Sequence, residues 1–495
     1  MHAWALRLAL GGLVGACQTA GTDPAPHAEC VRETRNAGSP PNIVVLFADD
    51  MGWGDVGCYE GSQCQTPNID RLAREGLRLT SFYVAAPACS PSRAALLTGC
   101  YPVRVGVPEV LGPKSPTGLA PSEETLAELL RERGYTTAMV GKWHLGDAPA
   151  MLPTAQGFDS WTGLPYSNDM WPWHYGDPER GVIGNPNWPD LPLFDGGQVT
   201  QLNPNQDSLT PLYTKRALEF LDAHVHAQGN AQAASPFFLY YAFSHPHVPI
   251  AASERFRGKS GQGLYADMIL EIDDAVGQVV AKLEELGLAQ NTWVVFTSDN
   301  GPWTRFGDHA GTTGPWRGDK GTCFEGGMRM PCVVWAPGQM VAGRTSDQVT
   351  TAMDLVPTVA ALTGARLPSR PIDGVDQSAL WTGRGELPIP GPFFYYYPSE
   401  LHAVRVGRWK LHAPHPFRKV VTPGQGGYPG EQTFVQVERS LYDLEADPGE
   451  TTNVAASHPE IVRRLERELE RARVELGDSL VGRKGRAVRP AGKAQ

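Results

Sequence analysis

Short runs that are apolar at nearly every position alternate, from residue 41 onward, with longer stretches whose apolar positions follow a helical period. The short runs are rich in Val, Ile, Phe and Tyr, which is typical of strands covered on both faces of a sheet. We therefore expect buried strands in five places, at residues 42–48, 136–140, 237–243, 292–297 and 332–335.

Three amphipathic stretches between these runs are predicted to be helices. One begins at Thr66-Pro67, a capping residue followed by a proline suited to a first turn, and ends near Gly76. A second covers 122–134, with two glutamates in its first turn. The longest covers 265–286. This alternation predicts an α/β fold with a large mixed, mostly parallel sheet flanked by helices, over residues 41–385.

The pattern changes after residue 385. Short strands are expected at 393–397, 402–406 and 409–412, and a charged amphipathic helix at 458–476. We interpret residues 386–478 as a smaller C-terminal α+β domain, an antiparallel sheet plus a helix. The remaining residues, 479–495, are polar and basic, and their composition predicts a solvated, disordered tail.

The composition is that of a globular protein, with 41% hydrophobic and 19% charged residues in 495. The net charge of -10 argues against a nucleic-acid partner, because general nucleic-acid binders show a basic excess. An anionic small molecule is still compatible with this charge, since a binding site needs only local positive charge.

The N-terminus has the pattern of an export signal. Arg7 precedes a run of apolar and small residues that ends at Cys17 and is too short to span a bilayer. Residues 13–17 resemble a bacterial lipobox, so we predict a lipoprotein-type signal at 1–17, a lipid anchor on Cys17 and a flexible tether at 18–40. The protein would then be exported to the periplasm or the cell surface. The alternative is an ordinary signal peptide cleaved nearby.

Two polar pairs follow predicted strands. Asp49-Asp50 ends the first strand, and Asp299-Asn300 ends the strand at 292–297. Ligands gather at this edge of open α/β sheets, so the two pairs can converge into one site. An oxygen-only set suits calcium or magnesium better than zinc. The alternative is that each pair is a polar strand-to-loop turn.

A distinctive run begins at Cys89 and continues Ser90-Pro91-Ser92-Arg93 before ending in Leu97-Thr98-Gly99. Pro91 near the start and Gly99 just past the end frame a short helix. Cys89 is therefore at or near the N-cap, where free backbone N–H groups and the helix dipole favour an anion. A buried structural cysteine at a helix start is the alternative.

This run resembles the signature of the type I sulfatases, and in particular their arylsulfatase A-like and N-acetylgalactosamine-6-sulfatase-like branch, within the alkaline-phosphatase-like superfamily. The resemblance extends from about residue 41 to 453. It implies that a maturation enzyme, a partner of the chain, oxidises Cys89 to formylglycine. It also implies one calcium ion, with magnesium as the alternative, held by Asp49, Asp50, Cys89, Asp299 and Asn300.

Further motifs match the family. They are Lys142 and His144 in Gly141–Gly146, His247 in His245–Pro249, Lys320 in Lys320–Gly327, and Ser167 in a polar loop. The resemblance implies that Cys89, Arg93, Lys142, His144, His247 and Lys320 are catalytic. It implies that Ser167, Lys142, His247 and Lys320 contact the substrate. By the same resemblance, His247 or Lys320 protonates the departing alcohol and His144 later accepts a proton from the second hydroxyl of the formylglycine hydrate.

The implied activity is that of a sulfuric ester hydrolase of arylsulfatase type. It would hydrolyse aryl sulfates or sulfated sugars to alcohol and sulfate, through a formylglycine hydrate nucleophile and a sulfated-enzyme intermediate. A sulfate monoester is an anion, so a cation-rich site is needed to offset its repulsion of a nucleophile. The alternatives are a phosphomonoester or phosphonate hydrolase of the same superfamily, and a non-catalytic sulfoglycan-binding relative. A non-catalytic relative would need a degraded site, whereas every matched position is present.

Aromatic residues are frequent in the stretch 161–207, with Trp161, Trp171, Trp173, His174 and Trp188. They either stack on a sugar or aryl group at the mouth of the site or pack the loops there.

Overall fold

The computed structural model describes residues 39–59, 62, 64–174, 185–226 and 235–494. The predicted signal at 1–17 and residues 18–38 of the predicted tether lie outside these ranges. None of the helices within them combines the length and the apolarity that crossing a membrane requires.

A mixed sheet of 11 strands organises the first part of the chain, in the order β11-β2-β10-β9-β1-β8-β4-β5-β6-β7, with β12 beside β2. The central strands β9, β1, β8, β4 and β5 are parallel, whereas β10 runs antiparallel to both of its neighbours. This arrangement confirms the predicted α/β fold. The strands are β1 (Asn42–Ala48), β2 (Leu77–Tyr83), β4 (Thr136–Gly141), β5 (Ser160–Gly163), β6 (Pro192–Asp195), β7 (Gln198–Leu202), β8 (Phe237–Ala242), β9 (Thr292–Ser298), β10 (Arg329–Trp335), β11 (Arg344–Ser346) and β12 (Thr350–Thr351).

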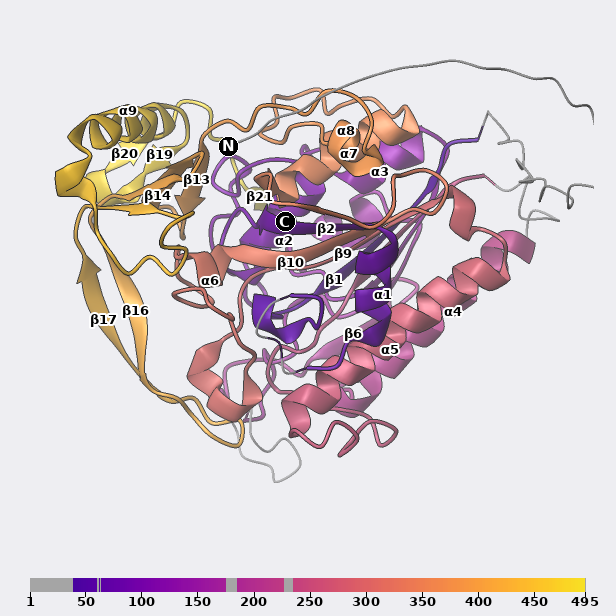
Figure 1. Ribbon diagram of the computed structural model, residues 1–495. Helices are drawn as coiled ribbons and strands as arrows, with labels where there is room; N and C mark the ends of the chain where they lie inside the picture. The colour runs from indigo at the N-terminus through magenta and orange to yellow at the C-terminus, as the bar shows by residue number, and fades with distance from the viewer. Residues whose placement is uncertain (1–38, 60–61, 63, 175–184, 227–234, 495) are drawn as a thin grey trace, which may run out of the picture. The chain divides into compact units, whose positions relative to one another are not determined.

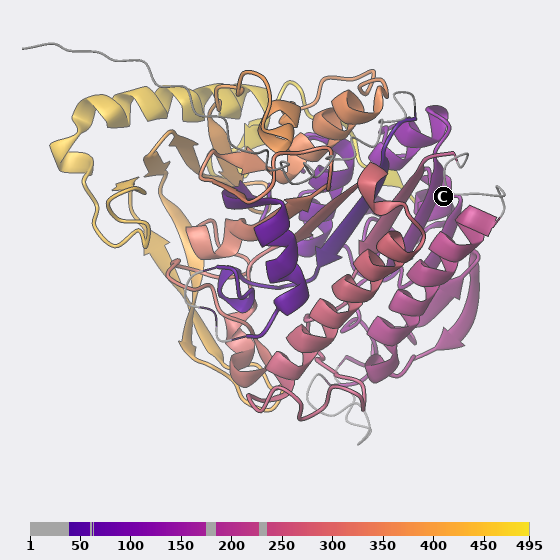
Figure 2. The ribbon, with the colours of Figure 1, turned by 45° about the vertical axis from the view of Figure 1, so that its right-hand side comes forward.

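Helices cover both faces of this sheet, which is why its central strands are apolar throughout. Ile43, Val45 and Phe47 of β1 face a cluster with α2, α3 and α7, while Val44 and Leu46 face α1, α4 and α5. Figure 1 and Figure 2 show α4 and α5 running side by side along the second face. The helices are α1 (Pro67–Glu75), α2 (Cys89–Thr98), α3 (Leu126–Glu132), α4 (Leu209–His226), α5 (Leu264–Glu285), α6 (Glu325–Met328), α7 (Leu355–Thr363), α8 (Ser378–Thr382) and α9 (Pro459–Glu475).

The predicted helix at 122–134 begins one turn later than expected, at Leu126. Thr125 is the N-cap, and its hydroxyl accepts the backbone N–H of Glu128 at 3.2 Å. The Glu128 carboxylate accepts the backbone N–H of Thr125 at 2.8 Å, which completes a capping box. The two glutamates assigned to the first turn therefore precede the helix.

The C-terminal part contains a four-stranded antiparallel sheet in the order β13-β14-β15-β18, a separate hairpin of β16 and β17, and the helix α9 (Figure 1). The sheet strands are β13 (Phe393–Tyr396), β14 (Leu401–Val406), β15 (Trp409–His412) and β18 (Ser440–Asp443). The hairpin strands are β16 (His415–Thr422) and β17 (Glu431–Val437).

The prediction of a disordered tail at 479–495 is wrong for residues 479–494. This segment forms β20 (Arg483–Lys484), which pairs with β19 (Gly477–Asp478), and β21 (Gly492–Lys493), which pairs with β3 (Thr117–Gly118). Two of its basic side chains have acidic partners: Arg489 forms an ion pair with Glu123 at 3.0 Å, and Arg483 forms one with Glu470 on α9. Strand pairing and these ion pairs therefore order a segment whose composition alone indicates disorder.

A fully buried ionic network joins the two parts of the chain. Lys410 on β15 forms ion pairs with Glu325 at 3.0 Å and with Glu450 at 2.8 Å, and all three side chains are 0% exposed. The Tyr395 hydroxyl also donates to Glu325, at 3.1 Å. Because Glu325 begins α6 five residues after Lys320, this network fixes the loop that carries Lys320.

We predict that Lys410→Ala lowers the free energy of unfolding by about 3–5 kcal/mol, because it leaves two buried carboxylates without their shared cation. Arg408→Ala is the matched control: it removes a cation from the turn before β15 that is 39% exposed and pairs with Asp443 and Glu445, and it should cost much less because exposed ion pairs contribute little to stability. Urea unfolding followed by tryptophan fluorescence measures both changes. Equal losses in the two variants would contradict the prediction.

Candidate active site

The two polar pairs leave the sheet side by side. β1 and β9 are parallel neighbours with Ala48 opposite Ser298, so the residues that follow each strand meet at one edge. The backbone N–H of Asp50 donates to Asp299 Oδ1 at 3.1 Å, and Asn300 Nδ2 donates to Asp50 Oδ1 at 2.6 Å. Asp49 and these three residues are all buried. The structure thus brings the four strand-end residues together.

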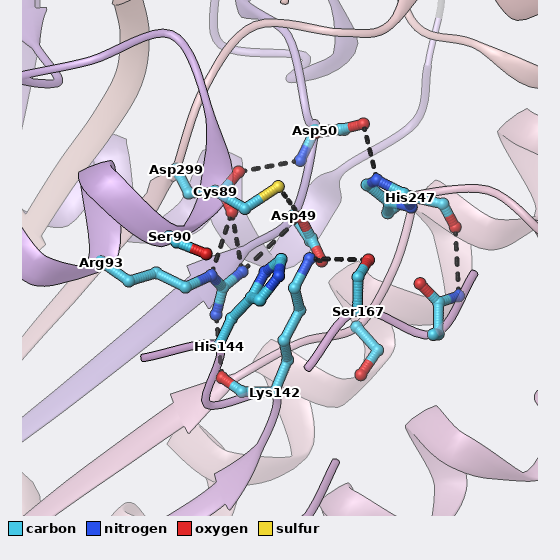
Figure 3. A network of polar contacts seen from close by, with 12 residues as sticks. Asp49, Asp50, Cys89, Ser90, Arg93, Lys142, His144, Ser167, His247 and Asp299 are labelled. Carbon is cyan, nitrogen blue, oxygen red and sulfur yellow. Dashed lines mark hydrogen bonds and ion pairs between the residues drawn. The ribbon is translucent and has the colours of Figure 1, made fainter. Parts of the chain in front are cut away.

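Cys89 is the first residue of α2 and points into this group of carboxylates (Figure 3). Its Sγ lies 3.5 Å from Asp49 Oδ1 and 3.4 Å from Lys320 Nζ. Burial raises the pKa of the thiol above its ordinary value, although Lys142 and Lys320 oppose this. A buried thiol that keeps its proton is a weak nucleophile.

Three cations surround the carboxylates. Arg93, one turn after Cys89 on α2, donates to Asp299 Oδ2 at 2.8 Å and to the Lys142 carbonyl oxygen at 2.9 Å. Lys142 Nζ donates to Asp49 Oδ2 at 2.5 Å. Lys320 Nζ contacts Asp50 Oδ1 at 2.8 Å. Three buried carboxylates are therefore matched by three cations.

Two histidines of the predicted set lie at this site, and both are buried. His144 has a left-handed φ of 65°, its Nε2 is 2.7 Å from the Leu111 carbonyl oxygen, and its Nδ1 has no partner among the described residues. His247 Nε2 lies 3.6 Å from Asp50 Oδ2. Burial lowers the pKa of both imidazoles well below the ordinary value, and the nearby lysines lower it further. Both rings are therefore neutral at neutral pH.

His245 and Ser167 have different places. His245 is buried, its Nδ1 is 3.2 Å from Thr210 Oγ1, and its carbonyl oxygen accepts the backbone N–H of Asp49 at 3.2 Å. Those contacts make it part of the scaffold under Asp49. Ser167 Oγ accepts a hydrogen bond from Lys142 Nζ at 3.1 Å, so it belongs to the polar cluster (Figure 3).

The sequence interpretation missed two aromatic residues at the site. Lys320 Nζ lies 4.6 Å from the ring centroid of Trp303, whose ring is 5.7 Å from that of His247. Tyr397 directly follows β13, and burial raises the pKa of its hydroxyl although Arg418 and Lys320 oppose this. Trp303 follows Asn300 by three residues, which is a usable signal, whereas Tyr397 comes from the C-terminal part.

The predicted aromatic stretch mainly packs the interior. Trp161 lies on β5, is 1% exposed and stacks on Phe194 with centroids 5.0 Å apart. Trp171 is also buried, at 3% exposure. His174 lies against Tyr428, with ring centroids 4.3 Å apart. For Trp161 and Trp171 the packing interpretation therefore holds.

The donor atoms at this edge fit a divalent cation. Asp49, Asp50, Cys89 and His247 each offer one ligand atom within 4.8 Å of the others. Asn300 Oδ1 is buried and has no hydrogen-bond partner among the described residues. Burial raises the pKa of both Asp50 and Asp299, which indicates that further positive charge would be stabilising. An oxygen-rich set of this kind suits a hard cation.

Comparisons with known proteins agree over most of the chain. The model of the sulfatase family matches residues 41–365, and the model of the C-terminal region of aryl-sulfatase matches 390–493. Arylsulfatase A of Homo sapiens is 40% identical over 450 residues, which cover 86% of each chain. N-acetylgalactosamine-6-sulfatase of Rattus norvegicus is 40% identical over 445 residues, covering 84% of this chain and 81% of that one. The crystal structure of the PsFucS1 sulfatase from Pseudoalteromonas sp. superposes with a TM-score of 0.76, at 29% identity, covering 88% of this chain and 90% of that one.

Proposed function

The chain belongs to the sulfatase family and hydrolyses sulfate esters, and we propose that it does so with a formylglycine made from Cys89 and one calcium ion. The observation that carries this proposal is the position of Cys89. It begins α2 at 2% exposure, within 3.5 Å of both Asp49 and Lys320, inside a complete set of buried charged residues. A maturation enzyme that oxidises the cysteine is an implied partner.

Asp49, Asp50, Asp299 and Asn300, with position 89, are the residues that would hold the ion. When present, the cation supplies positive charge toward the sulfate oxygens, and the hydrated aldehyde supplies the attacking hydroxyl group. The three carboxylates are already matched by Arg93, Lys142 and Lys320. A divalent ion would therefore leave the site positive, which favours a monoanionic ester.

The cations of the chain position the sulfate group. Arg93 is held in a fixed orientation by Asp299 and the Lys142 carbonyl oxygen. Lys142, in turn, lies between Asp49 and Ser167. Rigid donors of this kind orient the ester and stabilise charge that develops on its oxygens.

Lys320 and His144 fit the two proton transfers. The carboxylate of Asp50 keeps the pKa of Lys320 above its ordinary value although burial opposes this, so its Nζ carries a proton to give to the leaving alcohol. His247 is neutral and contacts Asp50, which suits substrate orientation. The Nε2 of His144 faces a carbonyl oxygen and therefore carries the ring proton. Nδ1 then has the free lone pair that accepts a further proton.

The names of the relatives support a substrate among aryl sulfates and sulfated sugars. One is named an arylsulfatase and another an N-acetylgalactosamine-6-sulfatase, at the same 40% identity. We therefore include both classes in the proposal. From the N-terminal signal pattern we also propose that the enzyme is exported. From the lipobox at Cys17 we propose that it is held at a membrane surface that faces the periplasm or the outside.

We predict that Cys89→Ala lowers turnover of 4-nitrophenyl sulfate by at least about 1000-fold without unfolding the protein, because it removes the precursor of the nucleophile. Cys89→Ser should accept sulfate once and stall, since a single hydroxyl lacks the second oxygen that expels the product. The control is Cys332→Ala, another buried cysteine, on β10. Assays of 4-nitrophenyl sulfate and phosphate side by side, with mass spectrometry of the Cys89 peptide, measure these effects. Sustained turnover by Cys89→Ala would contradict the proposal, and so would a wild-type protein that cleaves the phosphate ester faster than the sulfate ester.

Calcium is predicted to be the working ion. Thorough chelation should abolish activity, and calcium should restore it more fully than magnesium. Asn300→Ala, which removes the buried oxygen without a partner, should weaken calcium binding by roughly 10–100-fold. Asn291→Ala, at the opposite end of β9, is the control. Calorimetric titration measures affinity, and elemental analysis confirms that the metal has been removed; full activity of metal-free protein would show that no ion is needed.

The lipid anchor makes a separate prediction. Cells expressing the full chain should retain it in the membrane fraction, and Cys17→Ala should release it, because stable anchoring depends on the acyl chains. Fractionation followed by detergent phase partitioning measures the distribution. Identical soluble distributions of the two proteins would refute the anchor while leaving the catalytic proposal intact.

A further inference from the structure

A groove of about 470 Å³ lies between the β16–β17 hairpin and the segment 304–319. Arg418 and Lys419 line its hairpin side, and Thr304, Arg317 and Asp319 line the opposite side. The groove thus carries three basic groups and one carboxyl group, in a chain whose net charge is -10. Such a local excess of positive charge indicates an anionic ligand.

Two of the three cations have no close ion pair among the described residues, although Arg418 lies near enough to Asp319 to lower the pKa of that carboxyl group. Arg317 is committed to the fold, since its Nη1 donates to the Glu450 carbonyl oxygen at 2.7 Å and its guanidinium lies 3.9 Å above the ring of Phe324. Within the described part of the chain, neither Arg418 nor Lys419 has an ion pair within 4.0 Å or donates a side-chain hydrogen bond. Their donors are therefore available to a ligand.

The carboxyl group of the groove opposes an anion only weakly. Asp319 is 8% exposed and its carboxyl group accepts a hydrogen bond from the Thr304 hydroxyl, so this group is bound to the side of the groove and not free in it. Burial raises its pKa to about 6, which leaves a substantial neutral fraction in mildly acidic solution.

The groove adjoins the catalytic residues. Asp319 immediately precedes Lys320, whose Nζ is 3.4 Å from Cys89 Sγ. The guanidinium of Arg418 lies against Gly321, where an added Cβ would come within 1.8 Å of Nη2.

The direction of the leaving alcohol follows from the same contacts. Lys320 is the proposed proton donor to that alcohol, so the part of the substrate beyond the ester oxygen lies on the Lys320 side. Gly321, the residue after Lys320, lies against the guanidinium of Arg418. A sugar attached through this oxygen would extend into the groove.

We propose that this groove is a subsite for a second anionic group, a carboxylate or a sulfate, on the alcohol part of the substrate, where Arg418 and Lys419 bind it. The inference rests on the proposed function and deepens it, because it makes acidic oligosaccharides the preferred substrate class. Arg418 offers the planar pair of donors that matches a carboxylate or sulfate, and Lys419 adds a second charge.

Direct binding of a labelled probe tests the proposal. The probe is a fluorescent chondroitin 6-sulfate tetrasaccharide, and its Kd is measured by fluorescence anisotropy on the full chain. All variants carry Cys89→Ala, so that the probe is not consumed. Arg418→Ala with Lys419→Ala should weaken binding about 10-fold or more, and Arg418→Lys should restore part of it. Arg464→Ala, which removes an exposed cation on α9, is the matched control and should leave the Kd unchanged.

Carboxyl-reduced and desulfated versions of the tetrasaccharide show which anion the subsite takes. If removal of the carboxyl groups from the probe abolishes the difference in Kd between the Cys89→Ala protein and the double variant, the subsite binds a carboxylate. If removal of the sulfate groups abolishes that difference, the subsite binds a sulfate. An unchanged Kd in the double variant, an equal loss in Arg464→Ala, or no binding to the parent at millimolar probe overturns the subsite. Turnover of 4-nitrophenyl sulfate by the wild type, assayed separately, tests the proposed function, so the two failures are distinguishable.

Discussion

The mutual compensation of buried charges at the carboxyl edge of the sheet is the constraint on which the rest of this molecule depends. Three aspartates with little or no exposure would be strongly destabilising alone, because desolvation of a carboxylate costs several kcal/mol. Arg93, Lys142 and Lys320 make them tolerable, and each must arrive from a different element. The sheet order, the start of α2 and the loop before α6 all serve to place these six groups within contact distance.

The C-terminal part takes its meaning from the same constraint. Lys320 follows no strand of the parallel core, so its loop needs support from elsewhere. Part of that support comes through Glu325, which binds Lys410 on β15 and Tyr395 on β13 in addition to Tyr83 and Arg329 of the large sheet. The second sheet thus helps to fix the loop that carries Lys320. The separate β16–β17 hairpin of the same C-terminal part carries Arg418, which lies against Gly321, next to Lys320.

Sequence reasoning found the elements whose signals are local and missed those whose stability is tertiary. The strand at 42–48 and the helix from Thr66 to Gly76 could be predicted because continuous apolarity and capping residues are visible in the chain. The helix α4 was not predicted, although its buried Tyr213, Ala217 and Leu221 recur every four positions. The half-exposed strand β16 and the ordered segment 479–494 depend on partners distant in sequence, which no window of residues reveals.

The site divides in the same way. Strand-end chemistry alone indicated Asp49, Asp50, Asp299 and Asn300, and the helix start indicated Cys89, whereas Lys142, His144, His247 and Lys320 needed the family resemblance. Isolated lysines and histidines after a strand are usually surface residues, so only their motifs distinguish them. Trp303 and Tyr397 have no such motif. Their role follows from proximity to Lys320, and it has a physical consequence: the Trp303 ring faces the ammonium group while Asp50 binds it, so Lys320 keeps its proton at a buried position. In the proposed mechanism, the protonated Lys320 is then the proton donor during cleavage, and the neutral His144 is the proton acceptor during release of sulfate.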